Sequence, residues 1–426
     1  MILSRLERPT QPRPGWHQLG SDFGPTYAVN GFVAWVFSIT APLAIILSVG
    51  TRGGLSEAQI ASWVFGVFCV NGTLTVLFSW LYRQPLGFAW TIPGSVLVGP
   101  ALEHLTFPEV VGAFLFTGFL MLLLGASGWV RRAMQAVPMP IVMGMVAGVF
   151  LRFGLDLIRA LHQDFTIAGP MVVSYLLLAS IPMLGRRLPP MIGTLLVGAI
   201  VAAVLGRIDT AAIGSIELVR PVAQMPVWSW SAMLELVLPL AITVLVVQNG
   251  QGFAVLTAAG HKPPIDAITV ACGVGSMVSA MVGSVSTCLT GPSNAILVST
   301  GKRPRHYIAG ITCGLLSILF GLFAPAFTRL LLNAPKAFIA VLAGLALLRV
   351  LQAAFNTGFK DRFSFGALVS FLVTVADLPL FNIGAAFWGL VAGLLVSWLL
   401  ERRDFRGAEG DTTRETNAGH PAQGRG

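Results

Sequence analysis

The sequence predicts an all-α membrane protein of fourteen transmembrane segments, arranged as two inverted repeats of seven. Charged residues make up only 11% of the 426 residues and hydrophobic residues make up 55%, whereas soluble domains carry about 25% charged residues. Apolar runs of about 18 residues or more recur between residues 26 and 400, long enough for helices that span a bilayer. In addition, two interrupted apolar segments resemble each other at a fixed separation along the chain.

The first half of the chain gives seven segments in order. A polar tail, 1–25, precedes them, and the basic stretch WVRRAMQAVP between the fourth and fifth predicts a helix at the membrane surface. The third segment carries Pro and Gly in its middle, and so is expected as a short strand followed by a half-length helix. The expected segments are Tyr27–Val49, Ala58–Leu81, Pro85–Leu102, Val110–Trp129, Met139–Leu157, Ile167–Leu184 and Met191–Leu205.

The second half repeats this arrangement after a long polar loop, Gly206–Ser231, whose Trp228 and Trp230 are typical of a membrane interface. The stretch Pro264–Thr300 must cross twice in 37 residues, so one crossing, the tenth, is again expected to be strand plus half-helix. A polar tail from Glu401 is expected to be disordered. The other expected segments are Leu234–Ala259, Tyr307–Phe327, Ala337–Leu351, Phe363–Asp377 and Ile383–Leu400.

The distribution of basic residues supports this count. With the N-terminus inside, 20 of the 27 Lys and Arg residues fall on the cytoplasmic side and seven on the other. This positive-inside bias predicts that both termini are cytoplasmic. Because each half has an odd number of segments, the two halves would insert with opposite orientation.

The sequence motif of the third segment is repeated in the tenth. Thr91–Val98, TIPGSVLV, aligns with Thr290–Val298, TGPSNAILV, at an offset of 199 residues that superimposes their prolines. A second pair, Pro42–Gly50 and Gly252–Gly260, aligns at an offset of 210. A backbone break at membrane depth is tolerated only where it is buried in protein or lines a cavity. Interrupted segments in corresponding positions of two halves therefore indicate a transport site.

The amino ends of the two half-helices predict an anion-binding site. They are expected to face each other, and each carries about half a positive charge from unpaired backbone amides. Aromatic residues of the strand could face a planar ligand or instead face lipid or the core. The intramembrane amides could contact the ligand or join helices, a role that typically contributes less than about 1–2 kcal/mol. The predicted substrate-binding residues are Ser38, Thr40, Trp90, Thr91, Gly94, Ser95, Gln248, Asn249, Thr290, Gly291, Ser293 and Asn294.

Acidic residues lie near the ends of segments rather than at their centres. A cation carrier is expected to hold a buried carboxylate, so this pattern favours a substrate that brings its own negative charge. If transport is coupled to protons, the candidates are Glu103, at the end of the third segment, and Glu235, early in the eighth. Asp156 is expected to pair with Arg152 on the same helix, at the i,i+4 spacing.

Other residue types argue against other functions. The four cysteines lie inside apolar spans without CxxC spacing, which indicates neither disulfides nor metal ligands. The six histidines are scattered over loops and span ends and form no metal cluster or nucleophilic triad, so we expect no metal, no cofactor and no enzyme. The net charge of +9 arises from loops and tails without a continuous basic face, so no nucleic-acid partner is expected.

Four stretches resemble the bacterial benzoate/proton symporter (BenE-like) family: YRQPLGFAWTIPGSVLV, VPMPIVMGMVAGVFLRFGLD, QNGQGFAVLTAAGHKPP and GAAFWGLVAGLLVSWLL. The resemblance spans residues 30–400 and implies the 7+7 inverted-repeat fold of the wider uracil and sulfate transporter-like group. It implies a core domain from 26–128 and 231–328, a gate domain from 129–207 and 329–400, and an extracytoplasmic loop at 208–230. The tails, 1–25 and 401–426, would be cytoplasmic.

The resemblance also implies elevator-type movement and often a homodimer, through the gate domain. One departure stands out, because benzoate transporters carry an acidic residue after the Gly-Pro of the tenth segment and a histidine nearby, whereas here Ser293-Asn294 follow Gly291-Pro292. The substrate and the proton-coupling group therefore stay open.

The resulting hypothesis is a secondary active transporter, a proton symporter of a small organic anion such as the aromatic carboxylate benzoate. The alternatives are a transporter of a nucleobase or an inorganic anion on the same fold, and a passive anion channel. The expected location is the bacterial cytoplasmic (inner) membrane, and the expected partners are a small anionic substrate, protons and the lipid bilayer.

Overall fold

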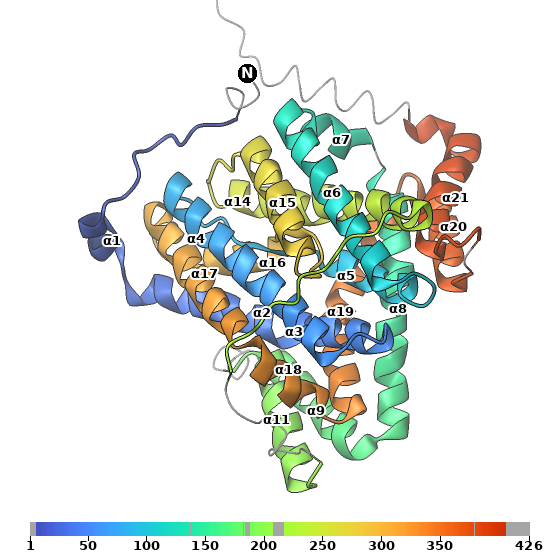
Figure 1. Ribbon diagram of the computed structural model, residues 1–426, viewed down its shortest axis with the longest axis horizontal. Helices are drawn as coiled ribbons and strands as arrows, with labels where there is room; N and C mark the ends of the chain where they lie inside the picture. The colour runs from blue at the N-terminus through green and yellow to red at the C-terminus, as the bar shows by residue number, and fades with distance from the viewer. Residues whose placement is uncertain are drawn as a thin grey trace, which may run out of the picture.

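The computed structural model describes residues 6–136, 138–181, 183, 188–207, 217–378 and 380–405. Its described residues are mostly helical, as predicted (Figure 1). One two-stranded ribbon accompanies the helices. Seven apolar helices are long enough to cross a bilayer, and six shorter ones and α16 accompany them in the described part of the chain. That number matches the predicted segments, while the count of fourteen crossings stays a prediction.

The long helices are α2 (Pro25–Arg52), α6 (Phe107–Ser127), α8 (Met139–Gln163) and α19 (Lys336–Gly358), with the composite helices Glu57–Tyr82, Trp230–Ala258 and Arg303–Leu322. The last consists of the short 3₁₀ turn η6 (Arg303–Arg305) and α17 (His306–Leu322). The shorter ones are α5 (Ile92–Ala101), α9 (Phe165–Ser180), α11 (Pro190–Val204), α15 (Ile265–Ala280), α16 (Gly291–Leu297), α20 (Ser364–Ala376) and α21 (Ala385–Leu400).

The ribbon joins the two predicted broken segments. Strand β1 (Phe88–Trp90) pairs antiparallel with β2 (Thr287–Leu289), with Ala89 opposite Cys288 at the centre. Both strands and both following helices are related by the offset of 199 residues that the sequence alignment gave. When each residue of one strand is replaced by its equivalent in the other strand, the list of paired residues stays the same. An inverted repeat requires this symmetry. Each half-helix therefore leaves an opposite end of the ribbon, with its amino end toward the strands.

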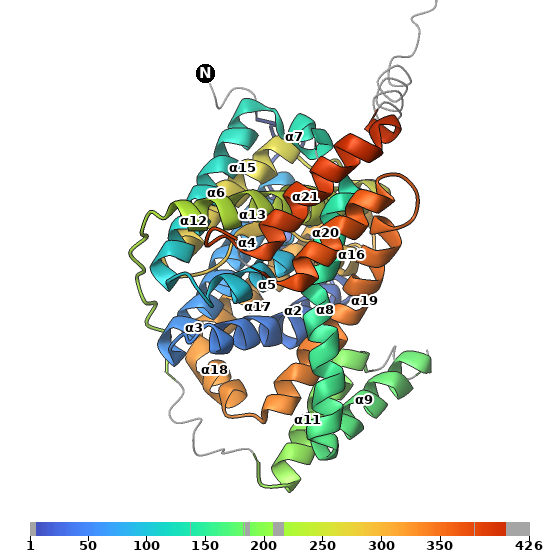
Figure 2. The ribbon, with the colours of Figure 1, turned by 90° about the vertical axis from the view of Figure 1, so that its right-hand side faces the viewer.

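Helix contacts divide the molecule into two sets. The ribbon set surrounds the strands and contains α2 to α6 and the helices from 230 to 322. The flanking set contains α8, α9, α11, α19, α20 and α21, which pack on one another at one side of the molecule (Figure 2). The sets meet where α2 packs against α19 and α5 against α8. The predicted core and gate domains cover similar parts of the chain, and the division into these two domains stays a prediction.

Two composite helices contain π-helical turns. Glu57–Tyr82 consists of α3 (Glu57–Phe65), η2 (Gly66–Val70) and α4 (Asn71–Tyr82). Trp230–Ala258 consists of α12 (Trp230–Ala232), η4 (Met233–Val237), α13 (Leu238–Ile242), η5 (Thr243–Asn249) and α14 (Gly250–Ala258). Such turns are rare and frequently occur at functional sites. The two in the second helix hold the predicted site residues Glu235, Gln248 and Asn249.

One predicted span is broken. The eleventh segment was expected to run from Tyr307 to Phe327, but α17 ends at Leu322 and α18 (Ala324–Leu332) follows. Pro325 explains the break, because proline lacks the N–H that would continue the helix and is well placed in the first turn of a new one. The stretch WVRRAMQAVP forms the predicted short helix over most of its length, as α7 (Val130–Ala136).

Both predicted tails are partly ordered. The first contains α1 (Trp16–Asp22), and Glu7 accepts hydrogen bonds from the first backbone amides of α15. In the second, the carboxylates of Glu401 and Asp404 accept from backbone N–H groups at the start of α20, so the predicted disorder is wrong for 401–405. These carboxylates satisfy donors that a helix start leaves unpaired, which fixes their place. The predicted disorder of 406–426 lies outside the described residues.

Candidate functional site

The first turn of α5 is organised by Thr91. Its hydroxyl accepts from the N–H of Gly94 at 3.1 Å, and its carbonyl accepts from the hydroxyl of Ser95 at 3.0 Å. The same hydroxyl donates to Thr243 at 3.3 Å, which ties the half-helix to η5. Gly94 is required by close approach, because a Cβ there would lie 2.7 Å from Cδ2 of Leu240. The predicted residues Thr91, Gly94 and Ser95 thus lie together at one end of the ribbon.

Asn294 organises the equivalent turn of α16, and its amide is already occupied. Nδ2 donates to the carbonyls of Gly87 at 3.0 Å and Thr290 at 2.6 Å, and Oδ1 accepts from the N–H of Gly87 at 2.9 Å. An amide has only two N–H donors, so none is left for an anion. The neighbouring Ser293 is buried, and its hydroxyl has no hydrogen-bond partner among the residues that the structure describes. Gly291 packs against Gln251, where a Cβ would lie 2.7 Å from that of the glutamine.

The adjacent amides of η5 have different environments. Oδ1 of Asn249 accepts from the N–H of Leu289 at 2.7 Å, and so holds the end of β2. Gln248 is 6% exposed and has no hydrogen-bond partner among the described residues. Its amide atoms are not among the fully enclosed polar atoms that lack a partner in the described structure, so they reach open space in which a ligand or water can complete the pairing.

Three further predicted residues lie around the ribbon. Trp90 is buried, its ring is 5.0 Å from that of Phe68, and its Nε1 has no partner within the described part of the chain. The hydroxyl of Ser38 donates to the carbonyl of Ala34 on its own helix, α2. Thr40 also belongs to α2, which packs against both half-helices, and its side chain lies outside the described structure.

The ribbon therefore brings most of the predicted substrate-binding residues together. Sequence reasoning missed Thr243, Ser286 and Thr287, three buried hydroxyl residues at the same place. The hydroxyls of Ser286 and Thr287 have no partner within the residues that the structure describes. Their position beside the ribbon could not be read from the sequence, because serine and threonine also occur frequently as ordinary helix-packing residues in membranes.

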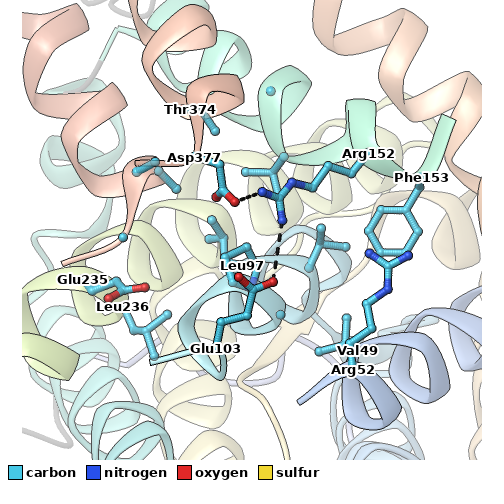
Figure 3. A pocket seen from close by; sticks show the side chains of 18 residues that line it. Val49, Arg52, Leu97, Glu103, Arg152, Phe153, Glu235, Leu236, Thr374 and Asp377 are labelled. Atoms are coloured by element: carbon cyan, nitrogen blue, oxygen red, sulfur yellow. Dashed lines mark ion pairs between the residues drawn. The ribbon is translucent and has the colours of Figure 1, made fainter. Parts of the chain in front are cut away.

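A cavity of about 40 Å³ lies between the ribbon set and the flanking set (Figure 3). Glu103 and Glu235, the two predicted proton-coupling candidates, both line it. It would hold a few water molecules, and it is far smaller than the roughly 300 Å³ at which ligand pockets begin. The two sets are therefore closed against each other at this place.

Ion pairs bridge the two helix sets beside this cavity. Arg152 of α8 pairs with Asp377, just after α20, and lies 4.0 Å from a carboxylate oxygen of Glu103 in the ribbon set. Arg52 at the end of α2 pairs with Asp156 of α8. The predicted pairing of Asp156 with Arg152 is wrong, because each finds a partner across a helix contact; Asp156 also pairs with Arg159 on its own helix.

Glu235 and Glu103 differ in environment. The side chain of Glu235 is 4% exposed and accepts from, or shares a proton with, Nε2 of His104 at 2.8 Å. The side chain of Glu103 is 61% exposed. His104 follows Glu103 directly in the sequence, so its position at the end of a span could be predicted. Its pairing with Glu235, 131 positions away, could not.

Two other histidines also form a pair, so the histidines are less scattered than expected. Nε2 of His261 lies 3.1 Å from Nδ1 of His306. Burial, with the neighbouring positive groups, lowers the pKa of His261 to about 4. Among the described residues no three His, Cys, Asp or Glu side chains gather where they could hold a metal ion.

Comparison with known proteins identifies the family. The family described as "Benzoate membrane transport protein", BenE, matches residues 21–399. The chain belongs to the BenE family. It is 31% identical to the inner membrane protein YdcO of Escherichia coli (strain K12), over 87% of this chain and 94% of that protein. It is 28% identical to the benzoate membrane transport protein of Acinetobacter baylyi, over 90% of this chain and 97% of that protein.

Solved structures share the fold of this BenE-family protein. The transmembrane domain of the cyanobacterial bicarbonate transporter BicA superimposes with a TM-score of 0.60 at 17% identity, covering 89% of this chain and 98% of that domain. Murine Slc26a9, an anion transporter in the inward-facing state, gives a TM-score of 0.60 at 14% identity, covering 93% of this chain and 73% of that one. The BenE-family chain is therefore a multi-pass membrane transporter of a small substrate.

Proposed function

We propose that this protein is a secondary active transporter that carries a small organic anion, an aromatic carboxylate such as benzoate, together with protons. The anion would bind at the ribbon and move with the ribbon set past the flanking set. The observation that carries this proposal is the ribbon itself, with one half-helix leaving each end and its amino end toward the strands.

The chemistry of the ribbon fits an anion. Helix amino ends favour negative charge through their unpaired N–H groups and the helix dipole. Gln248 and Ser293 supply polar groups without a hydrogen bond to any described residue, and Trp90 provides an aromatic face on β1. We therefore assign anion contact to these three residues, with Thr91, Gly94, Ser95, Thr290 and Gly291 shaping the two ends. Asn249 and Asn294 hold the ribbon in place, and Ser38 lies on the adjoining helix.

The choice of an aromatic carboxylate rests on the relatives. The relative from Acinetobacter baylyi bears the name of a benzoate transport protein, and the family description is the same. The proposed elevator movement rests on the division into two helix sets, with a closed cavity between them. A homodimer through the flanking set and cytoplasmic termini, in the bacterial inner membrane, complete the proposal.

Uptake of labelled benzoate into proteoliposomes tests the substrate. When the pH outside is lower than the pH inside, we expect benzoate to accumulate inside. The accumulation should reach about tenfold per pH unit if one proton accompanies each anion. Gln248→Leu should abolish this uptake while the protein stays folded. Gln352→Leu is the matched control, because Gln352 is an exposed amide on α19, away from the ribbon. Normal uptake by the Gln248 variant would contradict the assigned site.

Competition separates the alternatives. Unlabelled benzoate should displace the label, whereas displacement by uracil or sulfate instead would identify a nucleobase or inorganic-anion transporter on the same fold. A passive anion channel would give voltage-driven currents that are independent of the proton gradient. Such currents would contradict coupled transport.

A further inference from the structure

Glu235 is an unusual residue in this structure. It is the only acidic residue that is buried among the residues the structure describes. An intramembrane ionisable residue is costly, pairs with a nearby group and commonly marks an ion or proton pathway. Glu235 lines the cavity between the two helix sets, where such a pathway would run.

The carboxylate of Glu235 contacts both helix sets. Within the ribbon set it pairs with His104 at 2.8 Å. From the flanking set, the backbone of Gly384, directly before the first residue of α21, approaches it closely. A Cβ at Gly384 would lie 2.3 Å from Oε1 of Glu235, so only glycine allows this approach. A negative charge here is favoured by the amino end of the sixteen-residue helix α21.

The other charged groups around Glu235 are already paired. Along the cavity, Arg152 pairs with Asp377 and approaches Glu103, as Figure 3 shows. Arg52, which also lines the cavity, pairs with Asp156. Beside His104, the carboxylate of Glu109 accepts from the backbone and hydroxyl of Thr106.

We propose that the Glu235–His104 pair is the proton-binding site that couples the proton gradient to movement of the ribbon set against the flanking set. This inference rests on the proposed function and deepens it. A proton added to the carboxylate removes the negative charge that holds Glu235 to the amino end of α21. The closed interface is then weakened. When the sets close again, the proton leaves and the contact with α21 forms once more.

The coupling follows from thermodynamic linkage. A ligand shifts a conformational equilibrium only by its difference in affinity between the two states. The charged carboxylate contacts the flanking set in the closed state, so the closed state binds the proton more weakly than the open state. By the positive-inside prediction, this cavity faces the extracytoplasmic side, from which protons would enter with the substrate. Glu103, exposed and beside Arg152, does not have this role.

Labelling of an interface cysteine tests the pair without any substrate. Ala386, on α21, lines the cavity, so labelling of Ala386→Cys by a membrane-impermeant maleimide reports opening. The rate is divided by that of the exposed site Ala58→Cys, which corrects for the change in thiolate fraction with pH. The ratio should rise several-fold between about pH 8 and about pH 5 as the carboxylate is neutralised. In the Glu235→Gln background it should be high and independent of pH.

A labelling ratio that does not change with pH in the unsubstituted background would overturn the proposal. So would a labelling ratio that changes equally with pH in the Glu235→Gln background. His104→Gln should shift the midpoint of the pH dependence, because it removes the partner of the carboxylate. Glu57→Gln is the matched control, since Glu57 is exposed and pairs with Arg329 away from the cavity, and it should leave the profile unchanged.

Benzoate uptake gives the second readout. Neutral benzoic acid crosses bilayers by itself along a pH gradient, so the uptake of protein-free liposomes is subtracted first. The ratio of the remaining uptake with and without an imposed pH gradient should fall to about one in Glu235→Gln, because the transporter then has no proton site on which the gradient acts. A ratio equal to that of the unsubstituted protein would contradict the inference. An unsubstituted protein that takes up no benzoate would contradict the proposed substrate instead, while the labelling experiment would still decide on the proton site.

Discussion

Three buried amides near the ribbon have the same chemistry and different tasks. Asn294 uses both N–H donors on backbone carbonyls, Asn249 holds the end of β2, and Gln248 has no partner in the described structure. Two of them stabilise the irregular backbone that a membrane otherwise penalises. The third is available to a ligand. The sequence does not distinguish these tasks, because all three residues are polar amides within apolar segments. Their hydrogen bonds in the folded protein do.

This difference gives a prediction at the residue scale. Asn294→Leu should destabilise the protein by about 1–3 kcal/mol, because it leaves the N–H of Gly87 buried without a partner, while the carbonyl of Gly87 keeps the N–H of Thr290. Gln248→Met, the control, removes no hydrogen bond and should melt close to the unsubstituted protein. Thermal unfolding in detergent measures both. Equal melting temperatures for the two variants would show that Asn294 does not support the ribbon.

At the scale of elements, the two broken segments could be predicted from the sequence because they combine Pro, Gly and a repeated motif. Such residues mark a backbone break by their own geometry. The π-helical turns could not be predicted in the same way, because an apolar run looks alike in a straight and an interrupted membrane helix. The break at Phe323 did have a sequence signal, Pro325, which the predicted span Tyr307–Phe327 ignored. The pairing of Glu235 with His104 depends on helix placement, which local sequence does not contain.

Close helix packing gives a prediction at this scale. A Cβ at Gly273 of α15 would lie 2.5 Å from the backbone nitrogen of Leu122 in α6, so the two helices touch at backbone distance. Gly273→Ala should cost about 1–3 kcal/mol, because backbone cannot move aside as a side chain can. Gly154→Ala is the control. Its Cβ would meet nothing nearer than 3.6 Å, and alanine should stabilise α8 by up to about 1 kcal/mol.

Thermal unfolding of the two glycine variants separates these effects. A lower melting temperature for the α15 substitution, with an unchanged or higher one for the α8 substitution, is the expected result. A destabilisation of the same size in both would indicate a general intolerance of alanine rather than close packing of α6 and α15.

At the scale of the whole molecule, apolar side chains cover much of the outer surface, as a bilayer requires. On the flanking set, for example, Leu176, Ile200 and Leu372 are exposed. In lipid these side chains lose no contact by facing outward, so helix association depends on close packing and hydrogen bonds instead. The overall composition therefore sufficed to predict a membrane fold. The division into two helix sets needed the contacts between helices, since both sets have the same apolar composition.

A crosslink between the two sets tests whether they move. Arg52 and Asp156 face each other across the interface, so cysteines at both positions should be joined by a short, cleavable bis-methanethiosulfonate reagent. We expect benzoate uptake to stop after the reagent and to return after reduction, because elevator-type movement separates these positions. The four native cysteines are buried, which limits side reactions. Asp164 and Arg207, paired at 2.7 Å within the flanking set, provide the control, and their crosslink should leave uptake intact. Uptake that continues with positions 52 and 156 joined would mean that the sets stay together during transport, so that the substrate would cross by a local gate rather than by movement of the ribbon set.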